Sequence, residues 1–403
     1  LRLACTRPDV AEPAWDDVLA ALERTLHYYY WDEANYRFRK VPNVISLQYT
    51  YKHNLQAGEI EAFAANTLKT VLGATATGHG FSVLLSPDPS LVTDDTLLKL
   101  VVSSPSGEHV VRQKALGEEL RTYCQSMLAK RGDLLRVNQN TLLFCAPDAD
   151  QLADARREAT DYVSWRKVQD NSADWDRIGA TQQRLVKERL DSLSGASLHA
   201  LLSAYRWVVV PTASPRRAEP SLELVDVGAF GPGARLAPTL WDRLTQQGGN
   251  TQRILTEIAP SELVDRYGTE TGLAQQMTVS TAELRDLFPK SLGLPRLASE
   301  DVLIGALRAG EKDGLWALGQ LVHQDAPRDR RESYVSLYYG EPITRPSEPA
   351  IGERWLIIDS KLYEELQNAP RKVTPADVER AVEALDGGGQ PVRVQAIANY
   401  IAG

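Results

Sequence analysis

The sequence predicts a mixed α/β (α+β) protein with several domains. Its 403 residues exceed the ~100–200 residues of one ordinary domain, so about two to four domains are expected. In the first half, short apolar runs rich in β-branched residues alternate with segments of helical periodicity. This alternation is typical of an α/β layer with at least partly parallel strands. Hydrophobic residues make up 43% and charged residues 24%, a balance that allows a buried core and argues against general disorder.

Residues 1–45 predict part of a winged helix. Acidic residues open a segment with apolar positions at helical spacing up to Leu26, which indicates a helix. Two aromatic-rich runs, 28–31 and 36–40, flank a short turn that carries Asp and Asn, which indicates a β-hairpin. A helix followed by a hairpin is the second half of a winged helix, and the hairpin is its wing.

Residues 46–211 predict the central α/β domain. A helix is expected from Leu47 to about Thr70, followed by a break of small residues at 73–80. The predicted strands cover residues 81–85, 97–102, 140–146 and 207–211. The predicted helices between them cover residues 110–129, 151–167, 174–193 and 197–206.

The remaining chain predicts a mixed helical and β region at 212–370. Its first residues, 212–220, contain two prolines and an Arg-Arg pair and are predicted to form an interdomain linker. Residues 371–403 carry an N-cap at Thr374, Pro375 at the first helical position, a glycine run and a short apolar run. This order predicts the start of a second winged helix, and the alternative is a generic helical hairpin.

No catalytic, cofactor or metal signature is complete in the sequence. The segment whose glycine spacing is most similar to that of a phosphate-binding loop is 73–80. It has His79 where Lys is required, and it precedes a strand instead of following one. Residues 228–233 share only glycine content with a nucleotide loop, and residues 355–359 look like a Walker B strand that lacks a P-loop. The six histidines form no H-x-x-x-H pair, and no serine lies in a G-x-S-x-G elbow. The carboxylate pairs at 16–17 and 94–95 fit helix capping and a turn.

Composition narrows the classes of protein further. The net charge of −8 argues against a surface that binds nucleic acid everywhere, but allows a local basic patch. The three cysteines are far apart in sequence, as expected for reduced thiols in the cytoplasm. No apolar run approaches the ~18 residues of a membrane span, so no membrane contact is expected. The first residue is Leu1, not Met, which predicts a fragment of a longer protein.

The candidate site is a set of three cations on the predicted wing. Arg37, Arg39 and Lys40 follow one another closely on the second hairpin strand, where a wing can contact the phosphates or minor groove of DNA. The alternative is that the aromatic residues pack the hairpin on its helix while the cations remain solvated.

Four segments, in this order, resemble one protein family. They read YRF with PNV at 36–44, NTLLF with APD at 140–148, YRWVVVP at 205–211 and LPRL at 294–297. Together they are similar to the large predicted AAA+ ATPases of a domain-of-unknown-function family (DUF 499). Members of that family are found in prokaryotic anti-phage islands beside DNA methylases, including BREX-like systems. The resemblance covers roughly residues 15 to 360.

The resemblance implies a cytoplasmic parent ATPase whose ATP and Mg²⁺ are bound by a domain upstream of this chain. It also implies DNA methylases or other defence-island proteins as partners, and a homo-oligomeric parent. No catalytic residue carries over, because the family's P-loop and Walker B lie N-terminal to the hairpin. Gln139 stands where the family often has Arg, which puts the role of that position in doubt.

The first hypothesis is therefore the C-terminal, non-motor portion of such an ATPase, in contact with DNA or partner proteins. The alternative is a stand-alone winged-helix regulator or scaffold without ATPase activity. A third possibility is an enzyme whose site in the α/β layer has no sequence signature. Whether the chain itself is an enzyme stays open.

Overall fold

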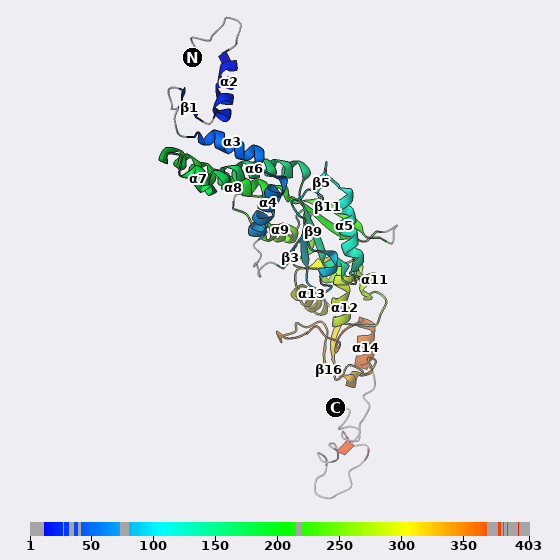
Figure 1. Cartoon of the computed structure of the whole chain (residues 1–403). Coiled ribbons are helices and arrows are strands. Elements are labelled where there is room, and N and C mark those ends of the chain that lie inside the picture. The colour runs from blue at the N-terminus through cyan, green and yellow to red at the C-terminus, as the bar shows by residue number, and fades with distance from the viewer. Residues whose placement is uncertain are drawn as a thin grey trace. The chain divides into compact units, whose positions relative to one another are not determined.

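A computed structural model describes residues 12–26, 28–31, 36–38, 42–72, 80–214, 219–231 and 233–368, together with positions 378, 379, 382, 385 and 394. The chain divides into two units (Figure 1). Unit 1 comprises Leu1–Ile258 and Arg285–Leu303, and unit 2 comprises Ala259–Leu284 and Ile304–Gly403. Both units contain helices and strands, which confirms the mixed, multidomain α/β class. The four predicted segments have other boundaries than these units and stay a prediction.

The helix and hairpin predicted for the first segment are both present. Helix α2 spans Glu12–Thr25, and strands β1 (Tyr29–Trp31) and β2 (Tyr36–Phe38) form an antiparallel pair. The buried side chain of Asn43 connects this part to the next helix. Its amide donates to the carbonyl of Glu23 at 3.0 Å and to that of Tyr29 at 2.6 Å, while its Oδ1 accepts from the amide of Ile45.

The helices of unit 1 differ from the prediction at two places. The single helix expected at 47–70 is two helices, α3 (Val44–Asn54) and α4 (Ala57–Leu72), because Leu55 adopts extended backbone dihedrals. The two helices expected at 174–206 are a short turn, α7 (Ser172–Trp175), and one long helix, α8 (Ala180–Ala204). Helix α8 continues through a single internal glycine, a residue that costs a helix only about 1 kcal/mol. Helix α6 (Ala149–Asp170) begins directly after the Pro-Asp turn, as expected.

A five-stranded sheet forms the centre of unit 1. Its strands are β3 (Ser82–Leu85), β4 (Lys99–Val102), β9 (Leu142–Ala146), β10 (Trp207–Thr212) and β11 (Ser221–Asp226). Strands β3, β4 and β9 are parallel, whereas β10 and β11 continue the sheet in antiparallel fashion, in the order β11-β10-β9-β4-β3. The segment between β10 and β11 thus connects neighbouring strands of one sheet. It does not separate two domains, contrary to the linker prediction.

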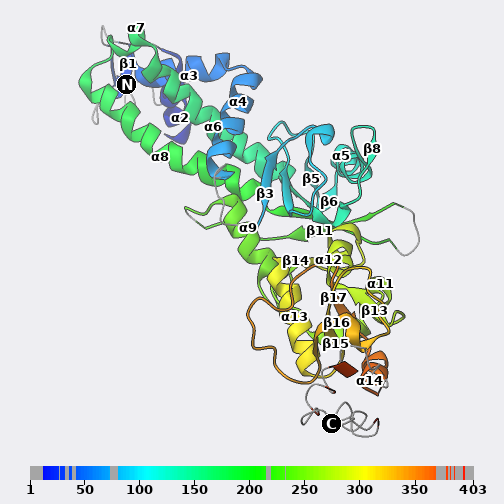
Figure 2. The ribbon, with the colours of Figure 1, turned by 90° about the horizontal axis from the view of Figure 1, so that it is seen from below.

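The sheet is covered by helices on both faces, and its central strand β9 is apolar at every position. In β9, Leu143 and Cys145 pack toward α4, α6, α8 and α9 (Leu236–Thr245), whereas Leu142 and Phe144 pack toward α5 (Glu118–Ala129) (Figure 2). Alternate residues of a strand point to opposite faces, which explains the division. Continuous apolar runs are typical of such doubly covered parallel strands.

The segment 110–129 is helical only in its second part. It begins with a small hairpin of β5 (Val111–Arg112) and β6 (Ala115–Leu116), and α5 follows. Both turn residues, Gln113 and Lys114, have positive φ angles of 50° and 60°. Two consecutive left-handed residues are characteristic of a tight type I′ turn. A second small hairpin, β7 (Lys130–Arg131) with β8 (Leu134–Leu135), follows α5.

The discontinuous part of unit 1 joins it through a short parallel pair, β12 (Ile254–Leu255) with β14 (Arg296–Leu297). Two helices carry the chain across the unit boundary: α12 (Thr281–Lys290) and α13 (Glu300–Lys312).

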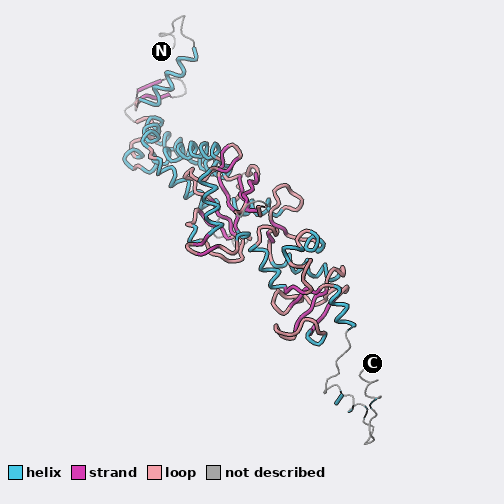
Figure 3. The backbone as a smooth tube through the Cα atoms, turned by 90° about the vertical axis from the view of Figure 1, so that its right-hand side faces the viewer, coloured by secondary structure: helices cyan, strands magenta, loops and turns pink. Residues whose placement is uncertain are grey.

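Unit 2 is built on a four-stranded antiparallel sheet in the order β13-β17-β15-β16. These strands are β13 (Thr278–Ser280), β15 (Ala317–Leu321), β16 (Tyr334–Tyr338) and β17 (Trp355–Ile358). Figure 3 draws the strands of the protein in magenta. The described helices entirely within this unit are α10 (Pro260–Asp265), α11 (Gly268–Thr271) and α14 (Ser360–Asn368). Strand β17 was the Walker B look-alike. It pairs antiparallel on both sides, and the carboxylate of Asp359 accepts from the amide of Lys361 at the start of α14. Nearly all of the second predicted winged helix, 371–403, lies outside the described residues.

Candidate nucleic-acid interface

The predicted wing cations are only partly described. Arg37 lies in β2 opposite Tyr30 of β1, so the expected hairpin carries it, whereas Arg39 and Lys40 lie outside the described residues. On the same hairpin, Tyr29 is buried and Phe38 is 72% exposed, with their ring centroids 5.3 Å apart. The packing of Tyr29 agrees with an aromatic anchor for the hairpin.

A groove of about 440 Å³ lies at the end of the helix that leads into this hairpin. Helices α2, α3, α6 and α8 all contribute side chains to it. Three of its lining residues are cations that come from three different helices: Arg24 of α2, Lys52 of α3 and Arg189 of α8. We call this feature the basic groove.

Helical spacing places the lining residues on the faces that meet in the groove. On α3, Gln48 and Lys52 are four residues apart, on α6 Asp161 and Trp165 share that spacing, and α8 contributes Arg189. Side chains separated by four residues lie on one face of a helix.

The helices around the groove are held together by polar and apolar contacts. The Gln48 amide donates to Ser164 Oγ at 2.7 Å, linking α3 to α6, and the Tyr51 hydroxyl donates to Asp174 Oδ2 at 2.6 Å. Burial and the neighbouring Asp174 carboxylate raise the pKa of Tyr51 to about 12. Val44 and Val186 contribute to the apolar core beneath. The groove therefore has a packed floor.

Charge is unevenly distributed in the basic groove. Asp161 is its one lining carboxylate and forms an ion pair with Lys52. Arg24 and Arg189 form no ion pair with any residue that the structure describes. Arg24 Nε donates to the carbonyl of Ala20, which leaves its terminal nitrogens and the Arg189 guanidinium for an anion. Guanidinium geometry matches phosphate oxygens well.

Aromatic side chains accompany these cations. Tyr49 is 38% exposed and stacks on His53 with centroids 5.8 Å apart, and Trp165 also lines the groove. Cations that follow a backbone beside exposed aromatic rings are typical of single-strand nucleic-acid binding. The arrangement can therefore bind both the phosphates and the bases of a nucleic acid.

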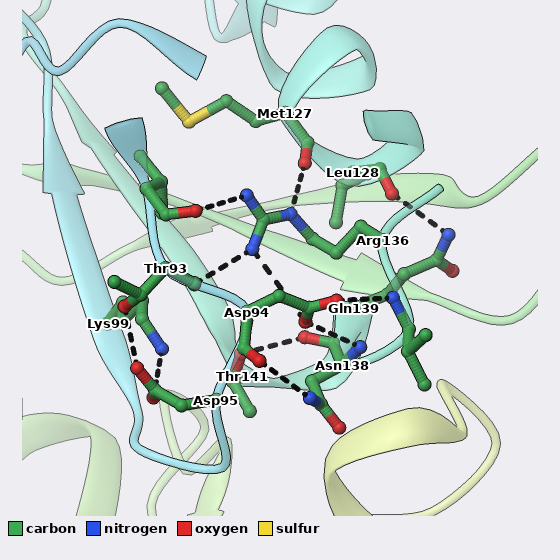
Figure 4. A network of polar contacts seen from close by, with 12 residues as sticks. Thr93, Asp94, Asp95, Lys99, Met127, Leu128, Arg136, Asn138, Gln139 and Thr141 are labelled. Atoms are coloured by element: carbon green, nitrogen blue, oxygen red, sulfur yellow. Dashed lines mark hydrogen bonds and ion pairs between the residues drawn. The ribbon is translucent and has the colours of Figure 1, made fainter. Parts of the chain in front are cut away.

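The paired carboxylates Asp94 and Asp95 act as turn acceptors, as expected. Asp94 accepts from the amides of Val137 at 2.8 Å and Asn138 at 2.9 Å, and the Asp95 carboxylate accepts from the side chains of its neighbours Thr93 and Lys99 (Figure 4). Burial alone would raise the pKa of Asp94, but the two amide hydrogen bonds and the nearby Arg136 outweigh it and lower that pKa. Both carboxylates are occupied by structural contacts.

Both described cysteines are buried. Cys124 and Cys145 are free and buried, and burial raises the pKa of both thiols. Cys5 lies outside the described residues. In the part of the chain that is described, no group of three or more His, Cys, Asp or Glu side chains is placed to hold a metal ion. None of the described helices is both long and apolar enough to cross a membrane.

Comparisons with known protein families, curated proteins and solved structures find no match. The functional argument therefore depends on the residues of the groove. Sequence reasoning located the hairpin but missed Arg24, Lys52 and Arg189. On α3 the signal is only that Lys52 lies at a helical interval from Gln48 and Tyr49, and on α2 and α8 it is a single cation. Which helices meet is set by tertiary packing.

Proposed function

We propose that the chain is the non-motor portion of an AAA+ ATPase of phage-defence type and that its basic groove binds DNA. The observation that carries the DNA contact is the pair Arg24 and Arg189, which form no ion pair with a described residue, beside the exposed ring of Tyr49. The hairpin with Arg37 follows directly in sequence on the helix that carries Arg24, so the wing is tested beside the groove. The resemblance to the DUF 499 ATPases supports the motor parent.

The remaining parts of the proposal come from the same resemblance. The parent binds ATP and Mg²⁺ upstream of this chain, forms a homo-oligomer and acts in the cytoplasm. Its protein partners are DNA methylases or other defence-island proteins. In this role the chain transmits DNA contact to the motor.

DNA binding is tested by fluorescence anisotropy with short single-stranded and duplex DNA over a range of salt concentrations. The double variant Arg24→Ala/Arg189→Ala should bind more weakly. Its slope of log affinity against log salt should fall by about 1.5, because two phosphate contacts are lost. A matched double variant, Arg157→Ala/Arg184→Ala, removes two exposed cations that lie outside the groove and pair with acidic neighbours. It should leave the slope nearly unchanged.

Equal losses in the two double variants would mean that net charge alone attracts DNA, and the groove would then be rejected as the interface. The variant Arg37→Ala/Arg39→Ala/Lys40→Ala tests the wing separately. If its affinity and salt slope equal those of the unchanged protein, the wing makes no contact.

A stand-alone winged-helix regulator is the second candidate, and the helix with its hairpin favours it. The two candidates differ in the gene upstream of Leu1. An open frame that encodes G-x-x-x-x-G-K-[ST] there supports the ATPase, whereas an immediate start codon supports the regulator. The purified chain should not turn over ATP, and sustained turnover would contradict the proposal.

A further inference from the structure

A second cavity, of about 270 Å³, lies in unit 1 and shares no lining residue with the basic groove. It is formed where the segment 285–303 covers the loops that lead into β4 and β9. A single water needs only ~10–15 Å³, so the cavity has room for an organic molecule. Residues 96–98 and 140–141 contribute one side and residues 285–303 most of the other.

The polar network of Figure 4 holds the two loops on the sheet side of the cavity. The guanidinium of Arg136 donates to the carbonyls of Val92 and Thr93 in one loop, and Asp94 accepts from amides of the other. Thr141, which lines the cavity, donates to the carbonyl of Asn138 at 2.7 Å. The cavity wall is therefore preorganised.

Arg296 lines the cavity and carries a buried positive charge. The residue is only 6% exposed, and its Nη2 donates to the carbonyl of Pro211 at 2.8 Å. Its Nε is buried without a hydrogen-bond partner, and no described carboxylate lies within ion-pair distance of the guanidinium. The nearby Glu223 is already paired with Arg253. Burial lowers the pKa of Arg296 to about 10, so the group remains charged at neutral pH.

Asn140 contributes an unpaired acceptor to the same cavity. It is 1% exposed, and its Nδ2 donates to the carbonyls of Phe288 at 2.8 Å and Leu294 at 3.0 Å. These two bonds fix the amide, while its Oδ1 is buried without a partner. A buried polar group without a partner costs about 1–3 kcal/mol. The lining of the cavity thus includes one charged donor and one neutral acceptor, each with one buried atom that has no hydrogen-bond partner.

The rest of the wall is apolar or already neutralised. Leu98, Phe288 and Leu303 line it, and the exposed Leu97 and Ser299 lie at its rim. The remaining lining cation, Arg285, is paired with Asp286 and approaches Glu300. A few polar groups in an apolar cavity are the usual composition of a small-molecule site.

We propose that this cavity binds a small organic carboxylate with an apolar body and an N–H or O–H donor next to the carboxylate. Arg296 binds the carboxylate and Asn140 Oδ1 accepts from the donor. A cation is repelled by the guanidinium, and a phosphate dianion exceeds the charge that one arginine can neutralise in apolar surroundings. A purely apolar ligand leaves both polar atoms unpaired.

Isothermal titration of the full chain with three related probes tests the ligand class. N-acetyl-L-leucine has the carboxylate, the N–H and the apolar body. N-acetyl-L-leucinamide lacks the charge, and 4-methylpentanoate lacks the N–H. The acid should bind at least about tenfold more tightly than the amide, because a charge-assisted hydrogen bond is lost with the amide. The 4-methylpentanoate should bind about threefold to tenfold more weakly than the acid. Absence of binding by the acid at millimolar concentration, or equal affinity for the acid and its amide, overturns the proposal.

Variants of the chain identify the residues involved. Arg296→Met removes the charge with similar volume, and Ala298→Phe fills the cavity while leaving Arg296 in place. Both should abolish binding of N-acetyl-L-leucine, with folding checked by circular dichroism. Arg157→Gln removes an exposed cation that does not line the cavity and should keep the affinity within about twofold. Unchanged binding in Ala298→Phe overturns the assignment to this cavity, even if Arg296→Met does not fold.

Discussion

At the scale of single residues, unit 1 depends on a guanidinium that never reaches solvent. The side chain of Arg136 is 0% exposed, and it donates to the carbonyls of Met127 at 2.7 Å, Thr93 at 3.0 Å and Val92 at 3.0 Å. Three backbone carbonyls from two segments thus accept from one planar guanidinium group. An ammonium group cannot reproduce that geometry.

We expect Arg136→Lys to lower the free energy of unfolding by about 3 kcal/mol, because buried carbonyls lose their donors. Urea unfolding followed by circular dichroism measures the change. Arg131→Lys, at an exposed position in the neighbouring small hairpin, is the matched control and should change stability by less than about 0.5 kcal/mol. Similar effects in both variants would show that the buried guanidinium group contributes little.

A second buried ionisable group, Glu311 in unit 2, destabilises the fold when it is charged, whereas Arg136 stabilises it. Glu311 is fully buried with Oε2 unpaired, and burial raises the pKa of its carboxyl, although the amide of Glu341 partly offsets this. Because the folded pKa lies above the unfolded value, the ionised carboxylate destabilises the fold at high pH. The cost is relieved as the pH falls through the folded pKa.

Glu311→Gln should therefore raise the free energy of unfolding by about 1 kcal/mol at pH 7 and have little effect near pH 4. Urea titrations at several pH values measure the difference. Glu365→Gln, in an exposed position of α14, should show no such pH dependence. A benefit that is constant with pH would contradict the role of ionisation.

At the scale of elements, the sequence predicts the buried strands well because burial on both faces leaves a continuous apolar run, as in β9 and β10. It fails where local geometry has no residue signature. The β5–β6 turn uses Gln113 and Lys114 at positive φ, positions where glycine or asparagine is the usual signal. Neither the basic groove nor the cavity at Arg296 could be predicted, since both depend on contacts between segments far apart in the chain.

The side chain of Asn43 connects helix α2, the hairpin and helix α3 through hydrogen bonds. Asn43→Ala removes two side-chain donors and the helix cap, so α2 and the hairpin should open more readily, by about 2 kcal/mol. Hydrogen exchange of amides in residues 12–38 measures this opening. Asn54→Ala, at the exposed end of α3, is the control. Unchanged protection of these amides in Asn43→Ala would show that apolar packing alone holds the hairpin.

At the scale of the whole molecule, unit 1 is discontinuous in sequence. Its segment 285–303 comes after residues 259–284, which belong to unit 2. This segment supplies the carbonyl partners of the Asn140 amide and the donor to Pro211. A chain of residues 1–258 should unfold with reduced cooperativity and bind the dye ANS, because buried polar and apolar surface is uncovered.

Fusion of residues 285–303 to that shortened chain through a glycine-serine linker should restore cooperative unfolding and remove the ANS signal. A scrambled version of the same segment is the control. Cooperative unfolding of residues 1–258 alone would show that the segment is dispensable.

Because unit 1 is made of two separate stretches of sequence, the ribosome must synthesise residues 259–284 of unit 2 before unit 1 can finish folding. When Ile258 has been added, the sheet can form, but the Asn140 amide and the Pro211 carbonyl still lack their partners. These two groups stay without their partners while residues 259–303 are synthesised, which takes seconds at ~5–20 residues per second. During that interval the loops of the future cavity lack the segment that covers them, so the nascent chain exposes surface that the finished unit buries.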